Sequence, residues 1–346
     1  MKGFGIIGLG TIAKTHADAI ESLHDCQFVA GFNKSIDKAN AFCSSYENAK
    51  GYDDIDKFLK DPSLDIVTIA TPSGSHLEYA LKALKAKKHI IVEKPLEITS
   101  ERCDLIIQCA RENNVTAAGI FQSRFFSAPQ LVKKAIDNGK FGKLSICDAQ
   151  VKWFRSQEYY DSAQWRGTWA LDGGGALMNQ GIHAIDLLLW LCGPVDEVSA
   201  YTALRSHTNI EVEDTAVAIL KFKNGALGVI EGTTSSYPGF LKKIDICGSL
   251  GSASIEEENL VKYQFSNETE EDKNDFEKLN NIAYSEGGAG SPKVSSFDSH
   301  AKVFEDVVNA INENREPLIS ATDAKKAVTL IEAIYKSARE SRPVKL

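Results

Sequence analysis

Short apolar runs alternate with amphipathic segments along the first third of the chain. The apolar runs lie at 3–8, 26–32, 65–71, 89–94 and 115–121, and the amphipathic segments lie near 12–24, 36–45, 75–86 and 100–113. Strands of a parallel sheet read as nearly continuous apolar runs because helices cover both of its faces. The alternation therefore predicts a Rossmann-type, doubly wound α/β sheet, which we assign to a domain of residues 1–121.

The pattern changes after Gln122. We expect a helix at 126–138, a strand at 144–154, a helix over 173–191, and β-rich runs at 195–206, 213–222, 226–234, 241–248 and 252–264. Turn signals such as "KNG" at 223–225 favour antiparallel hairpins. Residues 122–346 are thus predicted to form an α+β domain with a large, mostly antiparallel open sheet, and helices at 298–313 and 322–341 pack back. We expect the acidic run 267–275 to be a solvated loop.

Composition narrows the class of protein. The 346 residues carry a formal net charge of −8 without a basic patch, which argues against a nucleic-acid partner. No stretch reaches the roughly 20 apolar residues that cross a bilayer. The start of the chain is too glycine-rich for a signal peptide. Seven scattered cysteines and seven separated histidines form no metal-ligand motif. We expect a cytoplasmic protein with neither a resident metal nor a membrane partner.

A glycine-rich turn follows the first strand. Gly8, Gly10, Thr11, Ile12 and Ala13 fit G-x-G-x-x-G/A at a strand-to-helix junction, the context that gives this motif its meaning. Gly8 permits the turn, Gly10 allows a pyrophosphate to approach, and the helix N-terminus offers N–H groups to the anion. The motif predicts dinucleotide binding, and a tight turn without a ligand is the alternative.

The end of the second strand bears on which dinucleotide binds. Asn33, Lys34 and Ser35 stand where an acidic residue would bind a ribose 2′-hydroxyl. Lys34 and Ser35 suit a 2′-phosphate, whereas Asn33 can still bind the hydroxyl, and Lys34 is equally well explained as a solvated surface residue. The cofactor is therefore predicted as NAD or NADP.

Two further strand ends point towards the cofactor. Thr71 and Pro72 begin a loop suited to pass over the pyrophosphate. His76, which follows, is predicted to contact the cofactor, and an ordinary residue in the first turn of the next helix is the alternative. Lys94 follows another strand and precedes a proline, and ligands of open α/β sheets bind at such carboxyl ends. A partly desolvated lysine there can donate to an alkoxide. An exposed loop-tip lysine is the alternative.

The predicted helix over 173–191 carries polar residues through an apolar sequence. Asn179 and His183 are four residues apart, and Asp186 follows three later, so all three share one helical face. Burying an imidazole and a carboxylate costs several kcal/mol unless they are paired. A functional strip is favoured, and a self-satisfied His–Asp pair is the alternative.

These segments together resemble one known family. "GIIGLGTIAKTHADAI", "IATPSGSH", "EKPLEIT", "FQSRFFSAP", "LDGGGALMNQGIHAIDLLLWL" and "ATDAKKAVTLIEAIYKSARES" occur in the order found in the glucose-fructose oxidoreductase / inositol dehydrogenase / MocA group of NAD(P)-dependent oxidoreductases. The resemblance implies a Rossmann domain, an open-sheet substrate domain, and Lys94 and His183 as the acid/base pair of a secondary-alcohol oxidation.

The resemblance also assigns residues around these two. It implies cofactor contacts by Glu93 and Gln122 and a substrate contact by Arg124. Asn179 replaces the commoner aspartate of D-x-x-x-H, so it can orient a hydroxyl but cannot take up a proton. Asp186 either orients the histidine or makes a structural contact.

The substrate is interpreted from an aromatic and arginine-rich stretch. Trp153, Tyr159, Tyr160, Trp165 and Trp169 interleave with Arg155 and Arg166 in 152–175. Aromatic faces suit sugar C–H surfaces, and arginine suits carboxylates or phosphates. Trp165 and Arg166 are predicted substrate ligands, with packing as the alternative. This stretch resembles the branch of UDP-N-acetylglucosamine and UDP-N-acetylglucosaminuronate 3-dehydrogenases, so a nucleotide sugar is slightly favoured over a free sugar or inositol.

Several expectations stay open at this stage. Segment 285–300 is a candidate to fold over a diphosphate, with Lys293 and His300 near it, or to be a surface loop. A keto-sugar reductase and a non-catalytic NAD(P)-binding sensor are the rival functions. The family analogy favours a homodimer or homotetramer.

Overall fold

The computed structural model describes residues 1–283 and 297–346, which divide into two compact units. The first unit comprises residues 1–122 and 297–328, and the second comprises residues 123–283 and 329–346. Helix α11 (Ala321–Glu340) contributes residues to both.

The first unit is built on a six-stranded parallel sheet. Its strand order is β3-β2-β1-β4-β5-β6, the order of a dinucleotide-binding fold. The predicted doubly wound sheet is confirmed. The strands are β1 (Lys2–Ile7), β2 (Cys26–Phe32), β3 (Lys50–Tyr52), β4 (Ile66–Ile69), β5 (His89–Val92) and β6 (Ala117–Gly119). The helices of this unit are α1 (Thr11–Glu21), α2 (Ile36–Cys43), α3 (Ile55–Leu59), α4 (His76–Lys85), α5 (Ser100–Asn113) and α10 (Asp298–Glu313), with a short 3-10 turn at Ser73–Ser75.

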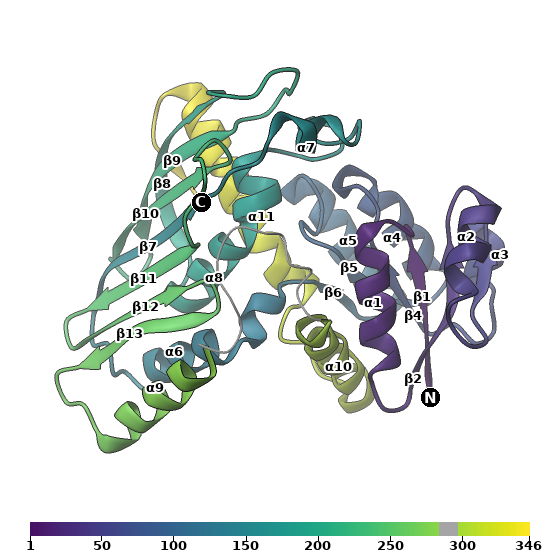
Figure 1. Cartoon of the computed structure of the whole chain (residues 1–346), viewed down its shortest axis with the longest axis horizontal. Coiled ribbons are helices and arrows are strands. Elements are labelled where there is room, and N and C mark those ends of the chain that lie inside the picture. The colour runs from purple at the N-terminus through teal and green to yellow at the C-terminus, as the bar shows by residue number, and fades with distance from the viewer. Residues whose placement is uncertain (284–296) are drawn as a thin grey trace. The chain divides into compact units, whose positions relative to one another are not determined.

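Helix α10 joins the first unit from the far end of the sequence. Its Phe304 packs against Phe4 of β1, with ring centroids 5.9 Å apart, and against His16 of α1 at 5.3 Å. Figure 1 shows α10 lying beside α1. This packing brings residues near 300 next to α1, the helix that follows the glycine-rich turn.

The second unit is built on an eight-stranded sheet of order β13-β12-β11-β7-β10-β9-β8-β14. Among the described strands of this unit, only β7 and β10 pair in parallel, so the predicted mostly antiparallel sheet is confirmed. The strands are β7 (Leu144–Lys152), β8 (Val195–Ala203), β9 (Thr215–Phe222), β10 (Leu227–Thr233), β11 (Lys243–Gly248), β12 (Gly251–Glu256), β13 (Asn259–Phe265) and β14 (Val344–Lys345). The helices are α6 (Ser127–Asp137), α7 (Gln157–Asp161), α8 (Ile182–Cys192) and α9 (Glu270–Ala283), with a 3-10 turn at Gln122–Phe125 and a π-helical turn at Ala176–Gly181.

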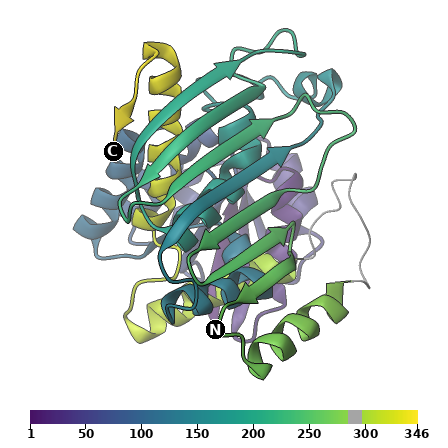
Figure 2. The same ribbon diagram turned by 90° about the vertical axis from the view of Figure 1, so that its left-hand side faces the viewer.

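One face of this sheet is covered and the other is open. Along β9 the burial alternates: Ala218 and Leu220 are buried, whereas Val217 and Ile219 are exposed. Figure 1 shows α6 and α8 on one side of the sheet, and Figure 2 shows the opposite face with no helix over it. The second unit therefore keeps its core on the helix side.

The acidic segment differs from the sequence prediction. Residues 270–283 form helix α9, so the expected solvated loop at 267–275 was wrong. Thr269 and Asp272 cap this helix reciprocally, because each side chain accepts a hydrogen bond from the other residue's backbone N–H. Glu270, Glu271 and Asp272 fill the first turn, where negative charge complements the helix dipole.

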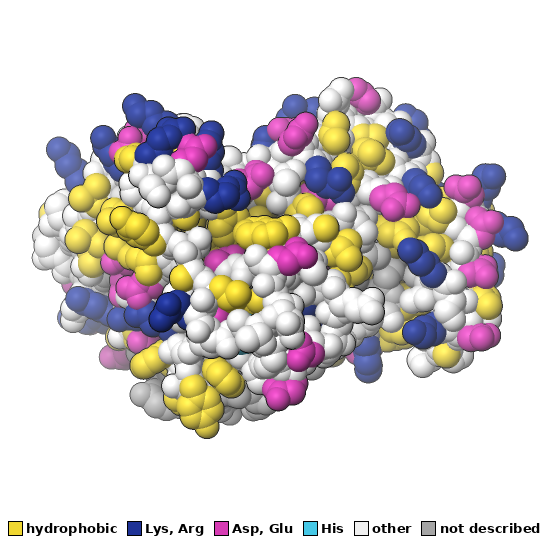
Figure 3. All heavy atoms as spheres, turned by 90° about the horizontal axis from the view of Figure 1, so that it is seen from above, with side chains coloured by type: hydrophobic (Ala, Val, Ile, Leu, Met, Phe, Trp, Pro, Cys, Tyr) yellow, Lys and Arg dark blue, Asp and Glu magenta, His cyan; other side chains and the backbone are white. Residues whose placement is uncertain are grey.

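Surface charge is mixed on the face that Figure 3 draws, where Lys and Arg lie among Asp and Glu side chains. In the part of the chain that the structure describes, no helix has both the length and the apolarity needed to cross a membrane.

Candidate functional site

The glycine-rich turn of the first unit is shaped to receive an anion. Gly8 has φ +94, and a Cβ there would lie 2.8 Å from the Ala70 backbone, so only glycine fits. At Gly10, by contrast, a Cβ would meet nothing within 4 Å. Among residues 1–283 and 297–346, no side chain caps α1 at Gly10. The N-terminus of α1 therefore faces open space with its N–H groups available, which fits a pyrophosphate.

The predicted ribose-side residues lie at the carboxyl end of β2. The Asn33 side-chain oxygen accepts a hydrogen bond from the Ser35 N–H at 3.0 Å, and the Ser35 hydroxyl caps α2 through the Lys38 N–H. Lys34 is exposed. Two of these three side chains thus shape the loop itself, and their contact with a cofactor stays a prediction.

His76 connects two loops of the first unit. Its ring is buried, with Nε2 2.9 Å from the Thr71 carbonyl oxygen and Nδ1 3.0 Å from the Pro95 carbonyl oxygen. Carbonyl oxygens only accept, so a neutral ring donates to one of them and an imidazolium donates to both. His76 therefore connects the loops at Thr71 and Pro95, and its buried ring does not reach out of the protein.

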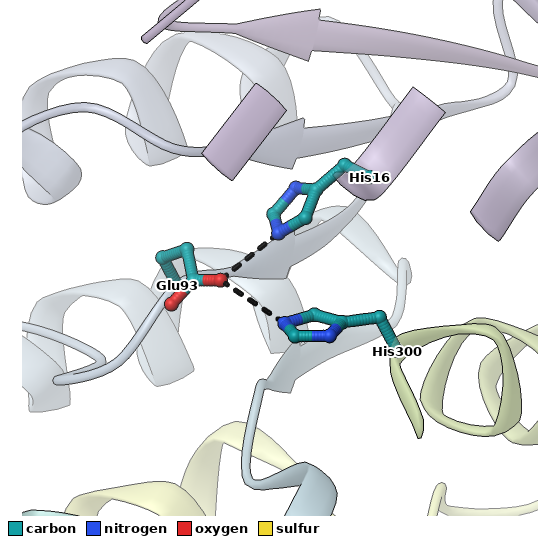
Figure 4. Close-up of side chains that lie close together, drawn as sticks. All are labelled: His16, Glu93 and His300. Carbon is teal, nitrogen blue, oxygen red and sulfur yellow. Dashed lines mark hydrogen bonds and ion pairs between the residues drawn. The ribbon is translucent and has the colours of Figure 1, made fainter. Parts of the chain in front are cut away.

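Glu93 is the centre of a buried cluster in the first unit (Figure 4). Its Oε1 lies 2.9 Å from His16 Nε2 and 3.8 Å from His300 Nε2. Burial raises the pKa of Glu93, but the hydrogen bond from His16 and the nearby imidazole of His300 outweigh burial, so the pKa is held well below its ordinary value. Burial lowers the pKa of His16. Glu93 is therefore an ionised carboxylate held by two imidazoles.

These three side chains also have the spacing of a metal-ligand set. One atom from each lies within 4.8 Å of the others, and all three residues belong to one unit. His16 and His300 are far apart in the sequence, so they form no short ligand motif and come together only in the fold. The expected position of His300 beside a substrate diphosphate is not what the structure shows, because its ring is buried against Glu93. Lys293 lies outside the described residues.

Lys94 follows Glu93 directly. Its backbone N–H donates to Glu93 Oε2 at 2.9 Å, and Lys94 as a whole is partly exposed. Gln122, at the end of this unit's first segment, has a buried side-chain oxygen that receives no hydrogen bond from the described residues. The roles of Lys94 and Gln122 towards a ligand stay predictions.

In the second unit, Asn179 lies in the π-helical turn that leads into α8. Its Nδ2 donates to Asp172 Oδ1 at 2.5 Å, and its Oδ1 accepts from Gln180 Nε2 at 2.7 Å. Asp172 is buried and also accepts the Gly167 N–H. His183 lies in the first turn of α8 and is half-buried. A carboxylate thus stands next to Asn179, although the sequence has no acidic residue at 179 itself.

Glu213 holds the glycine-rich segment that precedes Asn179. Its carboxyl oxygens accept the N–H groups of Gly175 and Leu177, at 3.0 and 2.9 Å, and the Tyr335 hydroxyl at 2.9 Å. A Cβ on Gly175 would lie 1.9 Å from the Glu213 carbonyl oxygen, which explains why glycine is needed there. Burial raises the pKa of Glu213 to about 7, against these hydrogen bonds.

Asp186 is paired with Arg124. Arg124 Nε and Nη2 donate to the two carboxylate oxygens at 2.8 and 2.6 Å, and both side chains are almost fully buried. Trp190 lies 5.8 Å from the guanidinium. The bidentate pair gives Asp186 a structural contact, and the prediction of Arg124 as a substrate ligand competes with it.

The aromatic and arginine-rich stretch folds as one cluster. The Arg166 guanidinium stacks 4.0 Å above the Tyr159 ring and 5.4 Å from Trp165. Arg155 lies 5.3 Å from Trp153 and 5.6 Å from Tyr159. Each guanidinium lies near aromatic rings and uses one nitrogen locally: Arg155 Nη1 donates to the Phe154 carbonyl oxygen at 3.0 Å, and Arg166 Nη1 donates to the Tyr159 carbonyl oxygen at 3.2 Å.

Sequence reasoning overlooked three residues that organise these sites: His16, Asp172 and Glu213. Asp172 belongs to the family motif that begins "LDGGG", and its position directly before three glycines was the sequence feature that could have indicated a role. His16 and Glu213 gave none, because their partners come from distant segments.

The glycine turn, the strand order and the open antiparallel sheet define a dinucleotide-dependent oxidoreductase with a separate α/β domain. Residues 2–120 match the NAD-binding Rossmann fold of the oxidoreductase family named for glucose-fructose oxidoreductase, inositol dehydrogenase and MocA, and residues 133–346 match its C-terminal alpha/beta domain. The chain belongs to this family, as the resemblance indicated.

Several relatives match along nearly their whole length. The WlbA dehydrogenase of Bordetella pertussis, solved in complex with NADH and UDP-GlcNAcA, is 31% identical with a TM-score of 0.89, covering 100% of this chain and 97% of that one. Myo-inositol 2-dehydrogenase of Thermotoga maritima is 27% identical, covering 99% and 98% of the two chains. D-glucoside 3-dehydrogenase of Escherichia coli is 26% identical over 72% of this chain and 76% of its own.

Proposed function

We propose that this protein oxidises a secondary hydroxyl of a nucleotide sugar that carries an acidic group, with NAD as the hydride acceptor. The full-length similarity to the WlbA dehydrogenase, whose complex contains NADH and UDP-GlcNAcA, carries the proposal. The anion-receptive turn at Gly8 and Gly10 supports the cofactor part of it.

Three residues share the chemistry in this proposal. The nicotinamide, when bound, supplies the hydride acceptor. His183 takes the hydroxyl proton, for which an imidazole near neutrality is suited, and Lys94 donates to the substrate oxygen and stabilises its developing charge. Asn179 orients the hydroxyl through its amide, which Asp172 and Gln180 hold in one orientation.

The acidic group of the substrate is inferred from the arginine cluster. Arg155 and Arg166 present fork-shaped donors that bind a carboxylate or phosphate bidentately, beside the rings of Tyr159 and Trp165. We assign Trp165 and Arg166 to this contact. An inositol or a free monosaccharide is the second candidate, because myo-inositol 2-dehydrogenase matches the whole chain.

NAD is proposed over NADP as the working cofactor. The nicotinamide complexes of similar structures contain NADH. Asn33 keeps an amide nitrogen for a ribose hydroxyl while its oxygen binds the Ser35 N–H. Fluorescence titration with NADH and NADPH tests this choice, and we expect at least tenfold tighter binding of NADH.

A substrate panel tests the function. Purified protein with NAD is assayed for NADH formation against UDP-sugars with and without a uronate group, free sugars and inositols. We expect turnover with UDP-sugar uronates, and a response to inositols alone would favour the second candidate. Lys94→Met and His183→Asn should each lose at least a hundredfold in kcat, whereas Lys82→Met and His24→Asn, on exposed surfaces, should not.

We also propose a homodimer or homotetramer formed through the open face of the large sheet. Tyr201, Val217, Ile219, Leu227 and Ile146 are exposed there, at 81, 44, 61, 54 and 49%. Strand register makes them neighbours: Tyr201 pairs with Val217, and Leu227 pairs with Ile146. Such a patch on a sheet is typical of an interface. Light scattering of Ile219→Asp should show a smaller species than the unchanged protein.

The seven cysteines are all free thiols in the structure, which supports a reducing compartment and hence the proposed cytoplasmic location. Cell fractionation with an antibody to the native chain tests it.

A further inference from the structure

Lys94 is fixed through its backbone rather than through its own side chain alone. We propose that His16 and His300 are positioning residues for Lys94, acting through Glu93, and that they tie this lysine to the cofactor-binding helix α1. This inference rests on the proposed function, because it requires Lys94 to act on the substrate.

The first step is the contact between Glu93 and Lys94. Glu93 uses one carboxylate oxygen for the backbone N–H of Lys94, at 2.9 Å, and the other for His16, at 2.9 Å. The two oxygens are thus committed to different partners, so the carboxylate cannot turn without breaking one bond. The backbone that carries Lys94 is held at the orientation of this carboxylate.

The second step concerns what keeps Glu93 ionised inside the protein. A buried carboxylate without partners protonates or moves towards water. Here His16, which is fully buried, and His300, which is 3% exposed, lie against it. Removing His16 removes the donor to Glu93 Oε1, and removing His300 removes the second imidazole beside the carboxylate; in either case the acceptor of the Lys94 N–H is held less firmly.

The third step is the anchoring of His16. A carboxylate only accepts hydrogen bonds, so His16 Nε2 carries the hydrogen and donates to Glu93. Nδ1 then accepts a hydrogen bond from the Thr68 hydroxyl at 3.0 Å. A neutral His16 therefore satisfies both neighbours. It lies on α1, two turns after the anion-receptive turn, so the position of α1 and the position of Lys94 are linked by one ring.

The residue after Lys94 is held as well. The Pro95 carbonyl oxygen lies 3.0 Å from the buried ring of His76. Lys94 therefore stands between two residues whose polar groups are each engaged by a buried histidine. Little freedom is left to its backbone, which suits an acid/base residue that must meet a substrate oxygen in one geometry.

The test compares leucine and glutamine at the two histidine positions. His16→Leu and His300→Leu remove the donor, whereas His16→Gln and His300→Gln keep an amide N–H near the place of Nε2. His89→Leu is the matched control, since this half-buried imidazole of the same unit accepts the Thr116 N–H and lies outside the cluster. All variants are assayed for kcat, KM and NADH affinity, and by thermal melting.

We expect the leucine variants to lose roughly 10- to 100-fold in kcat while KM and the Kd for NADH change by less than about threefold. Glutamine should restore most of kcat, and His89→Leu should keep it. If the leucine variants do not fold, Glu93→Met, which removes both carboxylate oxygens and with them the acceptor of the Lys94 N–H, should show the same loss in kcat.

Several results would overturn the inference. These are an unchanged kcat in His16→Leu, a rise in KM equal to the fall in kcat, or a control that loses as much as the cluster variants. A stoichiometric metal ion in the purified protein, lost in His16→Leu together with activity, would make the cluster a metal site instead. Lys94→Met distinguishes failure of the proposed function from failure of the positioning role. Full activity of Lys94→Met refutes the proposed function. Loss of activity in Lys94→Met together with full activity of His16→Leu refutes only the positioning role.

Discussion

Replacing Glu213 by glutamine tests whether a buried acid holds the segment in front of Asn179. Burial raises the pKa of Glu213 from 4.5 to about 7, although it accepts two backbone N–H groups and the Tyr335 hydroxyl. A group whose pKa is raised on folding contributes stability below its unfolded pKa, and this contribution is lost as the pH rises through the folded pKa. The relevant window therefore runs from about 4.5 to about 7.

The magnitude follows from this shift. Each pKa unit is worth about 1.4 kcal/mol of unfolding free energy. Most of the difference between the unfolded and the folded pKa of Glu213 falls between about pH 5 and pH 8. Ionisation of Glu213 should therefore lower the unfolding free energy by ~2.5 kcal/mol over this pH range. Glu213→Gln cannot ionise. It gives up one acceptor, opposite Gly175 or Leu177, at every pH, which costs about 1–3 kcal/mol.

Urea unfolding at one protein concentration, followed by tryptophan fluorescence, measures the effect. The unchanged protein should lose stability relative to Glu213→Gln by ~2–3 kcal/mol between about pH 5 and pH 8. Tyr335→Phe, which removes one donor and leaves the acid, is the control and should keep the pH dependence. Parallel pH profiles for the unchanged protein and Glu213→Gln would refute the raised pKa and the reasoning built on it.

Three further substitutions have defined outcomes. Gly8→Ala forces φ +94 on alanine and a contact with the Ala70 backbone, so we expect a loss of about 1–3 kcal/mol in unfolding free energy, together with weaker NADH binding. Gly10→Val enters open space, so the melting temperature should change by no more than roughly 2 °C while NADH binds at least tenfold more weakly; normal NADH affinity would contradict the site. Arg124→Met leaves Asp186 buried without its partner, and urea unfolding should show a loss of about 3–5 kcal/mol.

Local patterns predicted the elements well where burial is continuous. The five apolar runs of the first unit became β1, β2, β4, β5 and β6, because a strand covered on both faces leaves a direct trace in the sequence. The three-residue β3 leaves no such trace and was missed. The acidic segment was predicted as a loop because a run of like charges is usually solvated. The sequence also contains the helix cap formed by Thr269 and Asp272, which starts α9.

The candidate site was only partly predictable for a different reason. Gly8, Lys94 and His183 stand in short motifs with a readable context. His16 and His300 do not, since their meeting at Glu93 depends on α10 packing against α1. Asp186 was undecided because a helical face shows which residues are neighbours along one helix, and its partner Arg124 comes from another segment.

The central claim is that Lys94 serves the oxidation of an acidic nucleotide sugar by NAD. Single-turnover NADH formation is the most direct test, with the enzyme in excess over UDP-N-acetylglucosaminuronate and saturating NAD. We predict stoichiometric NADH from the unchanged protein and a rate at least about a hundredfold lower for Lys94→Met that still binds NADH normally. Equal rates for the two proteins, or no NADH from the unchanged protein, would contradict the account.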